Sequence, residues 1–247
     1  MALSDPLFLV LAVLAAFAVG LSKGGLPSVG ALSVPLLALS ISPVAAAGML
    51  LPIYVGSDLI GLWLYRHNYS ARNLAILIPA GLAGVLIGWV TAEKISTEHV
   101  MLLVGLVGLF YCINSLFAST KKMPKPASVV PGLFWGTFSG ISSFVAHSGA
   151  GPYQVYVLPQ RLEKMVFAGT STILFAAINF AKLFPYWCLG ELSINNAEIT
   201  LLLMPVSIIG AIVGARATKI IPDVLFFNTV KTVLAIVSIK LICDSIF

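Results

Sequence analysis

Charged residues are scarce in this 247-residue sequence, in which aspartate, glutamate, lysine and arginine together make up only 9%. A soluble globular domain contains about 25% of such residues. The scarcity of charge, with a hydrophobic fraction of 59% and a mean hydropathy of +1.04, excludes an ordinary soluble domain. Uncharged apolar stretches of about 20 residues recur along the chain, as membrane-spanning helices require.

Cysteine is also scarce, and its three positions, Cys112, Cys188 and Cys243, have neither metal-ligand nor redox spacing. We therefore expect no metal and no cofactor. The N-terminus carries Asp5 and lacks the basic stretch of a cleavable signal peptide. The formal net charge of +5 does not indicate nucleic acid as a partner, because the basic residues lie in short loops between apolar segments.

Hydrophobicity and helix breakers divide the chain into two sets of five apolar segments. The first set covers 7–21, 28–41, 44–65, 73–92 and 99–119, and the second covers 129–147, 152–159, 165–187, 194–213 and 224–246. A polar segment with lysines and prolines separates the two sets. We predict an all-α integral membrane protein with a first transmembrane repeat (1–120), a cytoplasmic linker (121–127) and a second transmembrane repeat (128–247).

Matching residues in the two halves indicate an internal duplication. The pattern P-x4-G-x3-G that begins at Pro79 in the first half recurs at Pro205 in the second half, at an offset of 126 residues. Gly48 and Gly169 lie 121 residues apart near the starts of two long segments, and at this offset Asp58 matches Asn179. Small residues four apart also allow close helix packing in lipid, so the glycines have a structural interpretation as well.

Positive charge is concentrated in four loops, which hold nine of the 14 lysines and arginines: Arg66, Arg72, Lys121, Lys122, Lys125, Arg161, Lys164, Arg216 and Lys219. The positive-inside rule predicts that these loops are cytoplasmic, in a cell inner membrane, and that both termini are outside. The two halves then have opposite orientations, which is an inverted-topology repeat.

Each half is expected to contain a broken or re-entrant helix hairpin plus three transmembrane helices. Fifteen helical residues, as in segment 7–21, span roughly 22 Å, whereas the hydrocarbon core is about 30 Å thick. We therefore favour re-entrant hairpins whose tips meet near the membrane midplane. Two full crossings at the start of each half are the alternative that the sequence leaves open.

The two hairpin tips carry the residues that we expect to bind substrate. The first tip reads GLSKGGLPSVG (20–30) and the second reads VAHSGAGPYQ (145–154). Glycines allow backbone amides to approach a ligand, helix N-termini attract anions, lysine adds a full positive charge, and histidine adds a charge that depends on pH. The candidates are Ser22, Lys23, Gly24, Gly25, Ser28, His147, Ser148, Gly149 and Gly151.

Asp58 is the candidate for a charge partner or a coupling site. A carboxylate inside a membrane is costly and therefore suggests a function. It would pair with Lys23 or carry a coupling proton or sodium ion, and its match Asn179 is neutral. A purely structural aspartate is the alternative. Lys182 is expected near the outer end of its helix with its ammonium extended to the surface, and Lys231 is a further candidate for facing the cavity.

The sequence resembles the sulfite exporter TauE/SafE family of membrane transporters. The features that carry this resemblance are G-x-S-K-G-G at 20–25, PLLAL at 35–39 and PVAAAG at 43–48, with a weaker copy of the layout in the second half. The resemblance implies export of sulfite or small organosulfonates, or transport of related sulfur-containing anions. The second tip has no lysine at the place of Lys23, which excludes a symmetric pair of tip lysines.

We therefore expect a secondary transporter that moves a small sulfur-containing anion by alternating access around a midplane site. An anion channel and an intramembrane enzyme are the alternatives, and the enzyme is disfavoured because H-E-x-x-H is absent and His147 and Ser148, being adjacent in the chain, rarely form a nucleophile–base pair. A structural subunit would not require Lys23 and Asp58 inside the membrane. The identity of the anion, the direction of transport and the oligomeric state cannot be read from the sequence.

Overall fold

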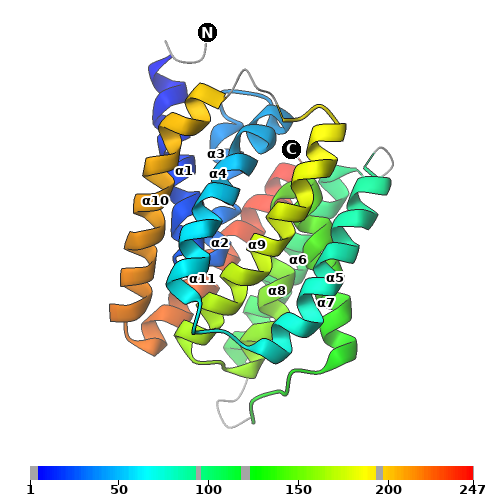
Figure 1. Ribbon diagram of the computed structural model, residues 1–247. Helices are drawn as coiled ribbons and strands as arrows, with labels where there is room; N and C mark the ends of the chain where they lie inside the picture. Colours follow the sequence, from blue (N-terminus) through cyan, green and yellow to red (C-terminus); the bar gives the residue numbers. More distant parts are fainter. Residues whose placement is uncertain (1–4, 93–95, 118–122, 193–196, 247) are drawn as a thin grey trace.

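The computed structural model describes residues 5–92, 96–117, 123–192 and 197–246, and every regular element within these ranges is helical (Figure 1). The long helices are α1 (Pro6–Lys23), α4 (Pro43–Tyr65), α5 (Ala71–Val90), α6 (Thr97–Phe117), α7 (Val129–Ala146), α9 (Lys164–Cys188), α10 (Ala197–Ile220) and α11 (Asp223–Ile246). The short ones are α2 (Pro27–Gly30), α3 (Ser33–Leu37), α8 (Ala150–Val157) and the 3-10 turn η2 (Leu158–Gln160).

Seven of these helices are long and apolar enough to cross a membrane: α1, α4, α5, α7, α9, α10 and α11. The prediction of an all-α, multi-pass membrane protein is therefore confirmed. Both α1 and α7 have 18 residues, or about 27 Å at 1.5 Å per residue. By length, the first arm of each predicted hairpin is thus closer to a full crossing than the 15-residue segment 7–21 suggested.

The predicted segment 28–41 is broken into two short helices, α2 and α3. Pro35 has no N–H to donate to the carbonyl of Ala31, which interrupts helical hydrogen bonding. The carbonyl of Gly30 instead accepts hydrogen bonds from the hydroxyls of Ser33 (2.5 Å) and Tyr54 (2.7 Å). Side chains thus replace the backbone partners that are lost at the break, as burial requires.

The helices pack in pairs that join the two parts of the chain. Helix α1 packs against α10, α5 against α7, α4 against α9, and α6 against α11. The repeated P-x4-G-x3-G pattern explains the first two pairs, because a Cβ on Gly84 or Gly210 would collide with the backbone of the facing helix. Gly84 faces Gly140 on α7, and Gly210 faces Gly20 on α1.

The outer surface suits lipid rather than water. Large apolar side chains are exposed around the bundle, among them Leu86 on α5, Phe134 on α7, Trp187 on α9 and Leu201 on α10. In the described residues, only three charged side chains are buried, Lys23, Asp58 and Lys182. The buried charge in the described residues is therefore confined to a small region.

The basic loops gather at one end of the bundle and both termini lie at the other (Figure 1). At the basic end, Lys164 Nζ donates to the carbonyls of Ile221 (2.6 Å) and Lys219 (3.3 Å), and Arg72 Nε donates to the carbonyl of Ala127 (3.0 Å). Lys121 and Lys122 lie outside the described residues. This segregation agrees with the charge pattern of the loops.

Candidate functional site

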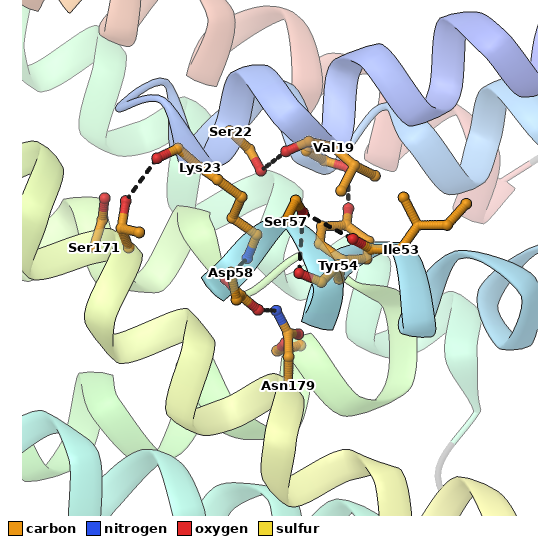
Figure 2. Close-up of polar contacts among 12 residues, drawn as sticks. Val19, Ser22, Lys23, Ile53, Tyr54, Ser57, Asp58, Ser171 and Asn179 are labelled. Carbon is orange, nitrogen blue, oxygen red and sulfur yellow. Dashed lines mark hydrogen bonds and ion pairs between the residues drawn. The ribbon is translucent and has the colours of Figure 1, made fainter. Parts of the chain in front are cut away.

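The three buried charges lie together where α1, α4 and α9 meet. Lys23 Nζ is 2.7 Å from Asp58 Oδ1, and Asn179 Nδ2 donates to Asp58 Oδ2 at 2.8 Å (Figure 2). Lys182 lies one helical turn beyond Asn179 on α9. Burying two opposite charges is tolerable only when they are paired and their remaining atoms are hydrogen-bonded, and the Asn179 amide meets the second oxygen of Asp58.

Two matching stripes of side chains bring these groups inward. Residues spaced at i, i+4, i+7 and i+11 lie on one face of a helix. The stripes are Tyr54, Asp58, Gly61 and Tyr65 on α4, and Phe175, Asn179, Lys182 and Tyr186 on α9, each pair 121 residues apart. The two stripes face each other, because Asp58 and Asn179 are in direct contact.

The first tip is held by hydrogen bonds to its carbonyl groups. Lys23 is the last residue of α1, and its carbonyl accepts from Thr172 Oγ1 at 3.1 Å. The carbonyl of Gly24 accepts from Tyr65 Oη at 2.7 Å and from Thr218 Oγ1 at 2.8 Å. Gly25 has φ +112°, a conformation that favours glycine. The two tip glycines therefore serve close packing rather than lining the cavity described below.

The second tip turns at His147, which ends α7 in the left-handed conformation (φ 50°). Its Nε2 is 3.1 Å from Tyr186 Oη, and its Nδ1 is 3.2 Å from Lys182 Nζ. Since the Tyr186 hydroxyl donates to the carbonyl of Phe144 (2.8 Å), its oxygen must accept from Nε2–H. The network thus assigns a neutral His147 whose Nδ1 accepts from Lys182, and not the charged histidine considered from the sequence.

Lys182 corrects the sequence prediction. It was expected to extend toward the outer surface, but it is 0% exposed and points to the second tip. Its ammonium donates to the carbonyl of Ser143 (2.9 Å), to His147 Nδ1, and weakly to Ser143 Oγ (3.4 Å). The spacing of Asn179, Lys182 and Tyr186 at i, i+3 and i+7 was the available signal, because it places all three on one face.

Two cavities meet at His147. The inner one, about 30 Å³, holds roughly two water molecules at most and includes Ser22, Lys23, Tyr54, Ser143, His147, Gly149, Thr172 and Asn179 in its lining. The outer one, about 610 Å³, is lined mainly by apolar side chains, with Glu98, His147, Tyr186, Glu191, Lys240 and Asp244 as its ionisable groups. The outer cavity lies at the end of the bundle that carries the termini and is called the vestibule below.

One acidic group of the vestibule lies outside the helices. Glu191 follows α9, and partial burial raises the pKa of its carboxyl above the ordinary value, while the charge of Lys182 acts in the opposite direction. Lys240 and Asp244, on the last turns of α11, form an ion pair at 2.5 Å. The vestibule therefore carries both signs of charge around an apolar wall.

Several predicted site residues lie away from the inner cavity wall. The Ser28 hydroxyl accepts from Gln154 Nε2 at 2.6 Å, a contact that joins the return helices of the two tips. Ser148 Oγ donates to the carbonyl of Ala146 (2.9 Å). Gly151 faces Val104 on α6. Lys231 lines neither the inner cavity nor the vestibule.

The helices and the buried charges define a polytopic membrane protein with an ionic cluster between two interrupted helices, the build of a membrane transporter rather than of a soluble enzyme. The family model for the sulfite exporter TauE/SafE matches residues 12–241, nearly the whole chain, so the protein belongs to the TauE/SafE family. Searches of curated proteins and of solved structures return no match.

Proposed function

We propose that the protein is a secondary transporter that exports a small sulfur-containing anion, sulfite or an organosulfonate, across the inner membrane by alternating access. The observation that carries the proposal is the buried ionic cluster of Lys23, Asp58 and Lys182, of which Lys23 lines the inner cavity between the two tips. Its net charge of +1 with all three groups ionised suits an anion. The family description, sulfite exporter, supports the substrate class and the direction that we propose.

We further propose that the two halves, 1–120 and 128–247, form an inverted-topology repeat joined by the linker 121–127. Equivalent residues make equivalent contacts, which supports this. A Cβ on Gly48 would lie 2.0 Å from the carbonyl oxygen of Glu191, and one on Gly169 would lie 1.8 Å from that of Asn68. Each glycine thus makes room for the loop that follows the other half's central helix.

The hydrogen bonds of two tyrosines repeat in the same way. Tyr65 on α4 donates to the carbonyl of Gly24 in the first tip, and Tyr186 on α9 donates to that of Phe144 beside the second tip. Asp58 and Asn179, which match at the same offset of 121 residues, contact each other directly. Two equivalent residues in contact must lie close to the twofold axis that relates the halves.

The access pathway supports alternating access over an open channel. The vestibule reaches inward to His147, but the inner cavity behind it is smaller than a sulfite ion with its four heavy atoms. At the other end, Gly24 is held by Tyr65 and Thr218. If the basic loops are cytoplasmic, as we propose, this conformation is accessible from the outside, and the helices must separate to admit or release the anion.

We propose that Asp58 couples transport of the anion to a proton or a sodium ion. A proton or a sodium ion at its carboxylate would neutralise it, so Lys23 would lose its partner and the positive charge available to the anion would rise. Asn179 has no titratable group, which would confine coupling to the first half.

The first test is thermal stabilisation of the detergent-purified protein by sulfite or methanesulfonate, with chloride at equal ionic strength as the control. A ligand that binds only the folded state stabilises it by RT ln(1 + [L]/Kd), so weak binding is detectable at high concentration. We expect a shift with the sulfur anions alone. Saturable flux in proteoliposomes that responds to a proton or sodium gradient then distinguishes a transporter from a channel. Stabilisation only by a cation or a neutral solute would contradict the proposal.

A further inference from the structure

Only one of the two buried lysines has a carboxylate partner. Lys23 is ion-paired with Asp58 at 2.7 Å, and the two charges offset each other. Lys182 donates to neutral acceptors, the Ser143 carbonyl and His147 Nδ1. Among the described residues, no acid is ion-paired with Lys182, although Asp58 and Glu191 interact with it at longer range. The net positive charge of the cluster is therefore located at Lys182.

An ammonium buried without a counterion in a membrane protein is costly, because its desolvation is not offset by an opposite charge. A bound anion would supply that charge. The weakest contact of Lys182, the 3.4 Å hydrogen bond to Ser143 Oγ, is the one that an anion would most readily replace. The neutral His147 adds no positive charge beside the ammonium, and the charge of Lys23 is offset by Asp58.

We propose that Lys182, and not Lys23, is the cation that binds the anionic substrate, and that Ser143, His147 and Lys182 form its anion subsite. This inference rests on the proposed function and locates binding within it. Ser143 and His147 both line the inner cavity, and His147 also lines the vestibule. Lys182 itself lines neither cavity in this conformation. Once the helices separate, an oxyanion entering from the vestibule past His147 accepts hydrogen bonds from Lys182 Nζ and the Ser143 hydroxyl.

The matched positions on the two central helices support the assignment. The residue of α4 that matches Lys182 is Gly61, and a Cβ there would lie 3.4 Å from Lys23 Cβ. In the first half the lysine, Lys23, belongs to the tip, and it packs beside Gly61 of the central helix. In the second half the lysine, Lys182, belongs to the central helix, and its side chain reaches the tip. The sequence comparison of the tips alone excluded a pair of tip lysines, but the fold still provides one lysine from each half.

The test compares Lys182→Gln and Lys182→Met with wild type and with Lys231→Gln, which removes a half-buried lysine of α11 that is not part of the buried ionic cluster. Thermal stability is measured without ligand and in a titration with sulfite and with methanesulfonate against a chloride background. We expect the Lys182 variants to bind these anions at least about tenfold more weakly, because a charge-assisted hydrogen bond is lost. Their melting temperature without ligand should not fall, since an uncompensated buried charge has been removed.

The outcomes distinguish a failure of the proposed function from a failure of the Lys182 subsite. Wild type without any response to sulfite or methanesulfonate would overturn both the proposed function and the subsite. Wild-type affinity in the Lys182 variants would overturn the subsite alone, and if Lys23→Met lost the response at the same time, Lys23 would be the binding cation. If both Lys182 variants failed to fold, Lys182 would have a structural role, and this too would overturn the proposal.

Discussion

The Lys23–Asp58 ion pair is short and buried, so removing either charge should lower the stability of the protein strongly. Each ion loses water on burial, and the partner at 2.7 Å, the Asn179 amide on Asp58 and the Tyr54 ring 5.0 Å from Lys23 Nζ offset that loss. Removing one partner therefore leaves a buried charge with nothing opposite it, whereas removing both leaves a neutral pair. The pair should thus behave as one unit in mutational tests.

We predict that Asp58→Asn and Lys23→Met each lower the free energy of unfolding by about 3–5 kcal/mol, because each leaves an uncompensated charge. The double variant should lose less than the sum, with a coupling energy of roughly 1–3 kcal/mol. Denaturant titrations of the four proteins in detergent measure this cycle. Additive losses would mean that the two side chains do not interact in the folded protein.

Two matched tyrosines allow a second residue-scale test. Tyr65→Phe and Tyr186→Phe each delete one hydrogen bond to a tip carbonyl, which should cost about 1 kcal/mol of stability. Tyr186→Phe alone also removes the acceptor of His147 Nε2–H, so the imidazole loses the constraint that directs Nδ1 toward Lys182. We expect weaker sulfite-dependent stabilisation in Tyr186→Phe than in Tyr65→Phe. An equal response in both would show that the orientation of His147 is unimportant for binding.

At the scale of elements, helix contacts are set by glycines that face backbone rather than side chains. The loop after α9 packs on the start of α4 at Gly48, and the loop after α4 packs on the start of α9 at Gly169. Any Cβ at either position would overlap a carbonyl oxygen, and backbone cannot rotate away as a side chain does. These contacts hold the ends of the two central helices and so position Asp58 and Asn179.

We predict that Gly48→Val and Gly169→Val each destabilise the protein by about 3 kcal/mol or more, at the upper end for overpacking. Gly81→Ala is the matched control, since its Cβ would meet only the side chains of Ile178 and Leu174 and should cost about 1 kcal/mol. Yield and melting temperature after detergent extraction report the difference. Tolerance of both valine variants would contradict the close packing of these loops.

At the scale of the whole molecule, the separation of charge between the two ends sets the expected orientation. Basic residues lie at the end opposite the termini, and the vestibule opens at the end of the termini (Figure 1). In a bacterial-type inner membrane the positive-inside rule directs the basic end to the cytoplasm. The vestibule would then open to the outside.

In a variant whose native cysteines are replaced by alanine, we predict that single cysteines at Arg72 or Lys219 resist a membrane-impermeant maleimide in intact cells and react after lysis. A cysteine at Asp244, which lines the vestibule, should react in intact cells. Labelling of Lys219→Cys from outside would reject the proposed orientation, because the end that carries the basic loops would then face outward.

Much of the architecture follows from local sequence properties. Apolar length and proline or glycine breakers predicted the long helices to within a few residues for most ends, since the membrane requires such segments and these residues interrupt them. The break between α2 and α3 was missed, although Pro35 is a signal for it in the sequence; what the sequence does not contain is the pair of hydroxyls, from Tyr54 and Ser33, that bond the Gly30 carbonyl at the break. The 121-residue offset was visible as well, although its extension to Tyr65 and Tyr186 became clear only from their matching hydrogen bonds.

From the sequence alone it follows that the protein crosses a membrane, that two tips interrupt its helices, and that Lys23 and Asp58 are candidates for buried residues of the site. Only the tertiary structure decided how the charges are distributed. Lys23 is neutralised by Asp58, 35 residues away along the chain, and Lys182 meets His147 from another helix. The physical reason is that electrostatic pairing depends on distances of a few ångströms between helices, whereas hydrophobic length and helix breaking are properties of contiguous residues.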